Sequence, residues 1–123
     1  MQIHKIAYLS GSLLGLIAVI AGALGAHGLK GQLSPDSMGS FETAVRFQMY
    51  HALLLLIVGY FLEKKPHKLG TRSFWAILVG TILFSGSIYL LVLTPLSLGL
   101  VTPLGGSILI FGWALMAFWL YQS

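Results

Sequence analysis

The sequence contains no cysteine and very few charged residues. Of its 123 residues 8% are charged, and the acidic ones are Asp36, Glu42 and Glu63. Without cysteine the chain can form no disulfide, and it has neither a thiolate nucleophile nor a thiolate metal ligand. An ordinary soluble domain is about one quarter charged. A water-soluble fold of this chain would therefore leave its surface apolar.

Carboxylates are missing from the apolar stretches of the sequence, and so are the common catalytic motifs. Proton-coupled transporters of this size commonly need an acidic residue inside the helix bundle. The chain also lacks the Gly-x-Ser-x-Gly elbow of hydrolases, the His-Glu-x-x-His zinc motif and the Gly-Lys phosphate loop. We therefore expect no enzymatic activity, no cofactor and no metal site.

What the sequence does contain is 57% hydrophobic residues, gathered into long runs. A helix of roughly 20 apolar residues crosses a hydrocarbon core of about 30 Å. Four such helices are predicted, at about residues 6–27, 35–62, 73–94 and 103–121. Ser34, Ser73 and Thr102 are the expected N-caps of the last three. The sequence predicts an all-α integral membrane four-helix bundle, with residues 1–123 forming a single transmembrane domain.

The basic residues are distributed unevenly. Lys64, Lys65, Lys68 and Arg72 crowd the connection between the second and third predicted helices, whereas the next connection has no Lys or Arg. The positive-inside rule therefore places the basic connection, and with it both termini, on the cytoplasmic side of the membrane. The net charge of +4 is a topology signal, so we expect membrane lipids rather than nucleic acid as partners.

The first predicted helix carries small residues at spacings of four, three, four and three. These residues are Gly11, Gly15, Ala18, Gly22 and Gly25. Such a seam lets a neighbouring helix approach closely. The neighbour is a helix of this chain, a second copy in a homo-oligomer, or another membrane protein. A ligand groove along the seam is the less favoured interpretation, because small-residue stripes in membranes are mostly packing surfaces.

Polar residues gather in the half of the predicted bundle that lies outside in this topology. A lone imidazole is costly in lipid, so His51 should face protein and bond to Gln48, Ser85, Ser87, Tyr89, His27 or water. Its role is either a structural hydrogen bond or contact with a proton or ligand; metal or haem held by His27 and His51 is a third alternative. The candidate binding cluster is His27, Arg46, Gln48, Tyr50, His51, Ser85, Ser87, Tyr89, Thr102, Gly105 and Gly106.

Five short strings, taken together and in order along the chain, are similar to a known family. They are Gly22-Ala-Leu-Gly-Ala-His-Gly-Leu29, Phe47-Gln-Met-Tyr-His-Ala-Leu53, Phe84-Ser-Gly-Ser-Ile-Tyr89, Thr102-Pro-Leu-Gly-Gly106 and Gly112-Trp113. The chain resembles the bacterial family called domain of unknown function 423, whose animal relatives are described as transmembrane protein 256. Leu24 and Phe47 stand where the family often has Phe and Tyr. The resemblance implies four helices in a bacterial plasma membrane, and it implies no activity or site.

Two hypotheses about function follow from these patterns. In the first, the protein is a non-enzymatic polytopic membrane protein whose outer-half cluster binds or passes a small ligand or a lipid headgroup. Arg46 and the start of the fourth helix, at Gly105 and Gly106, would suit an anionic group. The alternative is a structural or assembly partner of another membrane protein. A closed hydrogen-bonded cluster and an exposed glycine seam would favour the alternative.

Overall fold

The computed structural model describes residues 2–123, which form helices joined by short connections and contain no strand. The elements are α1 (Ile3–Ala23), a short π-helix η1 (Leu24–Gly28), α2 (Pro35–Lys64), α3 (Lys68–Leu93) and α4 (Val101–Gln122). α1 continued by η1, α2, α3 and α4 are each long and apolar enough to cross a membrane. The predicted all-α membrane fold with four helices is therefore confirmed.

The helix starts differ in part from those expected. Ser34 caps α2, since its hydroxyl accepts a hydrogen bond from the backbone N–H of Ser37 at 3.1 Å. α3 begins at Lys68, ahead of the expected start near residue 73, because His67 caps it by accepting from the N–H of Leu69 at 3.0 Å. The basic residues after His67 look like a loop by hydropathy, yet Lys and Arg are good helix formers.

Ser73 and Thr102 are not caps, contrary to the sequence prediction. Ser73 lies buried within α3, and its hydroxyl donates to the carbonyl oxygen of Gly112 on α4 at 3.1 Å. α4 begins at Val101, so that Thr102 lies inside its first turn. Both hydroxyls face a neighbouring helix rather than their own helix terminus.

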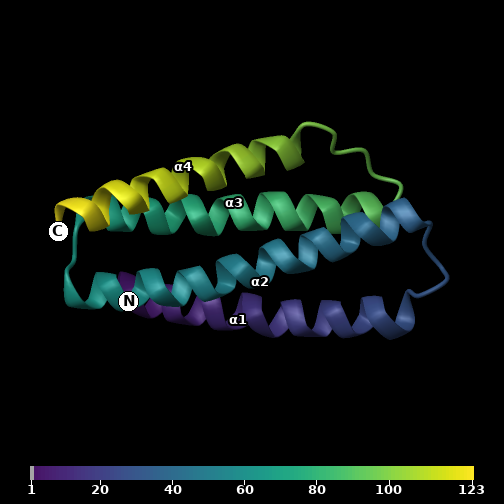
Figure 1. The fold of residues 1–123 in the computed structure, drawn as a ribbon, viewed down its shortest axis with the longest axis horizontal. Coiled ribbons are helices and arrows are strands. Elements are labelled where there is room, and N and C mark those ends of the chain that lie inside the picture. Colours follow the sequence, from purple (N-terminus) through teal and green to yellow (C-terminus); the bar gives the residue numbers. More distant parts are fainter. Residues whose placement is uncertain (1) are drawn as a thin grey trace.

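The helices lie next to one another in sequence order (Figure 1). α1 packs on α2, α2 on α3, and α3 on α4. The α1–α2 and α3–α4 connections lie at one end of the molecule, which we call the distal end. Both termini and the α2–α3 connection lie at the other end, the terminal end (Figure 1). The placement of the terminal end in the cytoplasm stays a prediction.

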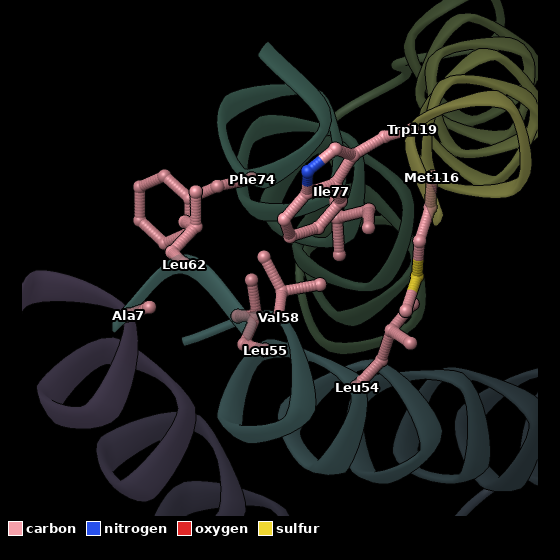
Figure 2. Packing of buried hydrophobic residues seen from close by; sticks show 9 residues of the cluster. All are labelled: Ala7, Leu54, Leu55, Val58, Leu62, Phe74, Ile77, Met116 and Trp119. Atoms are coloured by element: carbon pink, nitrogen blue, oxygen red, sulfur yellow. The ribbon is translucent and has the colours of Figure 1, made fainter. Parts of the chain in front are cut away.

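The hydrophobic core is concentrated at the terminal end, where all four helices contribute to it. Figure 2 shows the cluster of buried side chains, which is Ala7, Leu54, Leu55, Val58, Leu62, Phe74, Ile77, Met116 and Trp119. Gly70 makes room for the indole, since a Cβ at this position would lie 2.6 Å from the Trp119 ring. At the terminal end, buried side chains of α4 therefore belong to one cluster with side chains of α2.

The glycine seam of α1 faces α2 of the same chain. A Cβ at Gly11 would lie 2.8 Å from the carbonyl oxygen of Ala52, and one at Gly25 would lie 2.8 Å from the Phe41 ring. The other two seam glycines leave room for a Cβ in ordinary contact, at 3.8 Å and 3.6 Å from the nearest atom: Gly15 and Gly22. Within this chain the seam is thus a packing surface, with its closest approach at its two ends.

Candidate functional site

The polar residues predicted to form one cluster are divided between different sides of α2. One group surrounds Gln48 and faces α1 and α3. A second surrounds His51 and faces α4, and a third lies around Arg46 near the α1–α2 connection. Each group borders its own hollow, so the cluster does not converge on one cavity.

Gln48 joins three helices through its side-chain amide. Its Nε2 donates to the carbonyl oxygen of Leu14 on α1 at 2.8 Å, and its Oε1 accepts from the Tyr89 hydroxyl on α3 at 2.6 Å. Ser85, one turn before Tyr89, donates to the carbonyl oxygen of Ala44 on α2 at 2.8 Å. Gln48, Ser85 and Tyr89 are therefore brought together, as the sequence predicted. They line a hollow of about 180 Å³ between α1, α2 and α3.

His51 is buried and faces the bundle, as expected, but its partner is one that the sequence analysis did not name. The imidazole Nε2 accepts from the indole Nε1 of Trp113 on α4 at 3.0 Å. An indole N–H can only donate, so Nε2 carries no hydrogen and Nδ1 carries it. Nδ1 then donates to the carbonyl oxygen of Phe47 at 2.7 Å. This geometry requires a neutral imidazole with both nitrogens engaged.

Trp113 was the functional-site candidate that sequence reasoning missed. It occupies the middle of an apolar helix, where an indole N–H needs an acceptor. His51 supplies that acceptor, and the two rings meet edge to face with their centroids 5.9 Å apart. The Gly112-Trp113 string among the family-like motifs was the signal that pointed to this residue.

The remaining predicted residues of α3 and α4 hold these two helices together. The hydroxyls of Ser87 and Thr102 form a hydrogen bond, and Ser87 also donates to the Phe84 carbonyl oxygen at 3.0 Å. Gly105 belongs to a second seam, spaced four, three, four and three, that forms the buried face of α4: Gly105, Leu109, Gly112, Met116 and Trp119. A Cβ at Gly105 would lie 2.5 Å from the backbone nitrogen of Phe84. Its missing side chain therefore allows the two backbones to approach.

His27, Arg46 and Tyr50 lie apart from the Gln48 and His51 groups. Tyr50 is 55% exposed on the outer face of α2, and His27 is exposed in η1. Arg46 donates to the Thr43 hydroxyl at 3.2 Å and, with Glu42, borders a hollow of about 220 Å³ between α2 and the end of α1. The structure thus places Arg46 and the start of α4 at different hollows.

The His51 group borders a larger groove, which we call the α2–α4 groove. α4 packs along α3 but not directly on the backbone of α2 over residues 2–123, so a space remains between them. Trp113 spans this space to reach His51. The α2–α4 groove has a volume of about 510 Å³ and is lined by Phe47, His51, Phe84, Pro103, Gly106, Ser107, Leu109, Ile110 and Trp113.

The arrangement gives no geometric support to a metal or haem site. Among residues 2–123, no group of three or more His, Asp or Glu side chains could hold a metal ion. Both ring nitrogens of His51 are hydrogen-bonded within the chain, so neither is free to ligate. His27 is in η1, outside the His51 group.

Comparison with known proteins assigns the chain to a family. Residues 21–106 match the family described as Protein of unknown function (DUF423). The chain belongs to this family. The matched range begins within α1 and ends in the first turns of α4, so it includes Gln48 and His51 but stops before Trp113. The family resemblance read from the sequence is thereby confirmed.

Bacterial relatives cover nearly the whole chain. A UPF0382 membrane protein of Staphylococcus aureus (strain bovine RF122 / ET3-1) is 42% identical over 113 residues, which cover 91% of this chain and 92% of the relative. The UPF0382 membrane protein YwdK of Bacillus subtilis (strain 168) is 41% identical over 115 residues, covering 91% and 93%. No solved structure matches. With four apolar helices, the chain is a small multi-pass protein of the bacterial plasma membrane.

Proposed function

We propose that this protein is a non-enzymatic membrane protein that binds one apolar lipid chain in the α2–α4 groove. The observation that carries this proposal is the groove itself, about 510 Å³ in volume and walled by the rings of Phe47, Phe84 and Trp113. Ligand sites of about 300–1,000 Å³ are typically lined by apolar and aromatic side chains with few polar groups. The groove is of this size and has this type of wall.

The hydrogen bonds around the groove favour an apolar chain over a polar headgroup. Both nitrogens of His51 are engaged, and the Ser107 hydroxyl donates to the carbonyl oxygen of Pro103 at 2.9 Å. A polar headgroup would have to break these bonds in a low-dielectric environment, where an unpaired polar group costs several kcal/mol. An acyl chain needs no hydrogen bonds, and the bilayer supplies it at high concentration.

The test fills the α2–α4 groove without disturbing the fold. A Cβ at Gly106 would lie 3.5 Å from the Phe84 ring, in ordinary contact, so Gly106→Leu should fold and project its side chain into the groove. Gly86→Leu is the matched control, because a Cβ there meets nothing within 4 Å and Gly86 lines the hollow beside Gln48 instead. Native mass spectrometry in mild detergent then counts the lipids retained per protein.

We expect the wild-type protein and Gly86→Leu to retain one lipid and Gly106→Leu to lose it. The unfolding temperature of each variant, measured in the same detergent, reports whether the fold is intact. Equal lipid retention by all three folded proteins would overturn the proposal.

A second function, as a structural or assembly partner, is supported by a different observation. The side-chain hydrogen bonds of Gln48, His51 and Ser85 end on groups of this chain, which suits a cluster that holds helices together. The α1 seam packs on α2, so a partner protein would have to use another, outward-facing surface of the bundle. A membrane protein that copurifies stoichiometrically with wild-type and Gly106→Leu alike, with no lipid retained, would favour this function.

A further inference from the structure

A hollow of basic character lies at the opposite end of the molecule from the α2–α4 groove. It has a volume of about 480 Å³ and is lined by Pro66, His67, Lys68, Thr71 and Arg72. Lys68 and Arg72 are one helical turn apart in α3, so both cations lie on the same side of the helix. Both residues are exposed. We call this site the basic hollow.

The positive charge of the basic hollow is not offset by a neighbouring acid in its lining. Lys64 and Lys65 precede it in the chain and add two more cations. The acid nearest in sequence, Glu63, accepts a hydrogen bond from the Tyr8 hydroxyl at 2.6 Å, which holds its carboxylate against α1. The wall of the hollow therefore carries the two cations Lys68 and Arg72 and no carboxylate side chain, and Lys64 and Lys65 lie just before it in the chain.

Contacts among three elements shape the basic hollow. His67 accepts from the N–H of Leu69 at 3.0 Å, and its other ring nitrogen contacts the side-chain amide of Gln122, at the end of α4, at 3.1 Å. The Thr71 hydroxyl donates to the His67 carbonyl oxygen at 3.3 Å. The α2–α3 connection, α3 and α4 thus hold the first turn of α3, and with it Lys68 and Arg72, in place.

The surrounding aromatic residues place the basic hollow at the level of lipid headgroups. Tyr60, Trp75 and Tyr121 are exposed at 52%, 45% and 89%. Exposed Tyr and Trp at the ends of membrane helices are typical of the interface between lipid and water. The Lys64 ammonium lies 5.5 Å from the centroid of the Tyr60 ring, which links this aromatic level to the basic residues.

We propose that the basic hollow binds the phosphodiester of an anionic phospholipid. The planar guanidinium of Arg72 can donate two hydrogen bonds to two phosphate oxygens, and the Lys68 ammonium can donate another. Clusters of Lys and Arg next to the end of a membrane helix are typical sites for anionic headgroups. The occupant is a lipid rather than free phosphate because the aromatic level puts the hollow where phosphodiesters are concentrated. This site is separate from the α2–α4 groove and does not depend on it.

The test compares anionic with zwitterionic lipid. The protein is delipidated and titrated, by native mass spectrometry, with phosphatidylglycerol or with phosphatidylcholine of the same chains. The variants are Lys68→Gln with Arg72→Gln, Arg72→Lys alone, and Lys5→Gln as a control that removes an exposed cation at the same end of the molecule. Unfolding temperatures in phosphatidylcholine confirm that each variant is folded.

We expect the wild-type protein to prefer phosphatidylglycerol, and the double variant to bind it roughly tenfold or more weakly. Arg72→Lys should lose less affinity for phosphatidylglycerol than the double variant. Lysine keeps the positive charge but lacks the two parallel N–H donors of the guanidinium. Lys5→Gln should keep the preference. A wild-type protein without preference, or an equal loss in Lys5→Gln, would overturn the proposal. Displacement of the lipid by inorganic phosphate at millimolar concentration would overturn the assignment to a lipid.

Discussion

The indole nitrogen of Trp113 lies 3.0 Å from Nε2 of His51, and this hydrogen bond joins α4 to α2 across the groove between them. Trp113→Phe removes the donor but keeps most of the ring. We expect the free energy of unfolding to fall by about 1–3 kcal/mol, because the His51 acceptor is left without a partner in an apolar environment. Thermal unfolding in a fixed detergent measures the change.

The His51→Leu variant in the Trp113→Phe background serves as the control for that bond. The double variant should lose less free energy of unfolding than the two single variants lose together. Both the donor and the acceptor are then absent, so no polar group is left unpaired. Additive losses would show that the bond contributes no coupling energy.

Replacing glycine by alanine should lower stability where two helices touch and should leave it unchanged on an open helix face. Gly105→Ala would place a Cβ 2.5 Å from a backbone atom of α3, so α3 and α4 must move apart. We expect a loss of about 1–3 kcal/mol, measured by thermal unfolding. Gly86→Ala is the matched control, because its Cβ meets nothing within 4 Å and alanine favours helix. A Gly105→Ala variant as stable as Gly86→Ala would refute the close packing.

Gln48 should contribute more to stability than Tyr89, although the two bond to each other. Gln48→Leu removes the bonds to both the Leu14 carbonyl oxygen and the Tyr89 hydroxyl, whereas Tyr89→Phe removes one bond. We expect the larger fall in unfolding temperature for Gln48→Leu, and little further change when Tyr89→Phe is added to it. A larger effect of Tyr89→Phe alone would contradict the role of Gln48 as the joint between three helices.

Membrane topology can be read with single cysteines, because the chain has none of its own. We predict that Lys65→Cys, in the α2–α3 connection, reacts with an impermeant thiol reagent only from the cytoplasmic side. Ser37→Cys, at the start of α2, should react only from outside. The reverse pattern would refute the orientation but leave the four helices unchanged.

The fold was predictable because its signal is distributed over long segments. Four apolar runs fix four helices regardless of the details at their ends. The start of α3 was less predictable, since it depends on a single side-chain contact. His67 extends α3 toward its N-terminus by one hydrogen bond, and Ser73, which resembles a cap in the sequence, instead bonds to Gly112.

For the candidate site, the sequence predicted which polar side chains need hydrogen-bond partners inside the bundle but not which partner each one has. Burial in lipid requires His51 to face protein, and it does. The sequence could not indicate which helix supplies the partner, because Trp113 is distant along the chain and apolar runs have no register signal of their own. Gln48 and Tyr89 were both included in the candidate cluster as possible partners of His51, but the sequence did not pair them with each other.

The order in which the hydrogen-bond partners occur along the chain has a consequence for biogenesis. A chain emerging from the ribosome completes α1 and α2 first, and the Leu14 carbonyl oxygen is then already present to accept from Gln48. His51 enters the membrane in the same hairpin, but its donor is Trp113, more than sixty residues later in the chain. The Gln48 Oε1 acceptor gains its donor when Tyr89 of α3 inserts, whereas Nε2 of His51 stays unsatisfied until α4 inserts. A nascent chain stalled before α4 should for this reason be recognised by the insertion and quality-control machinery as incomplete.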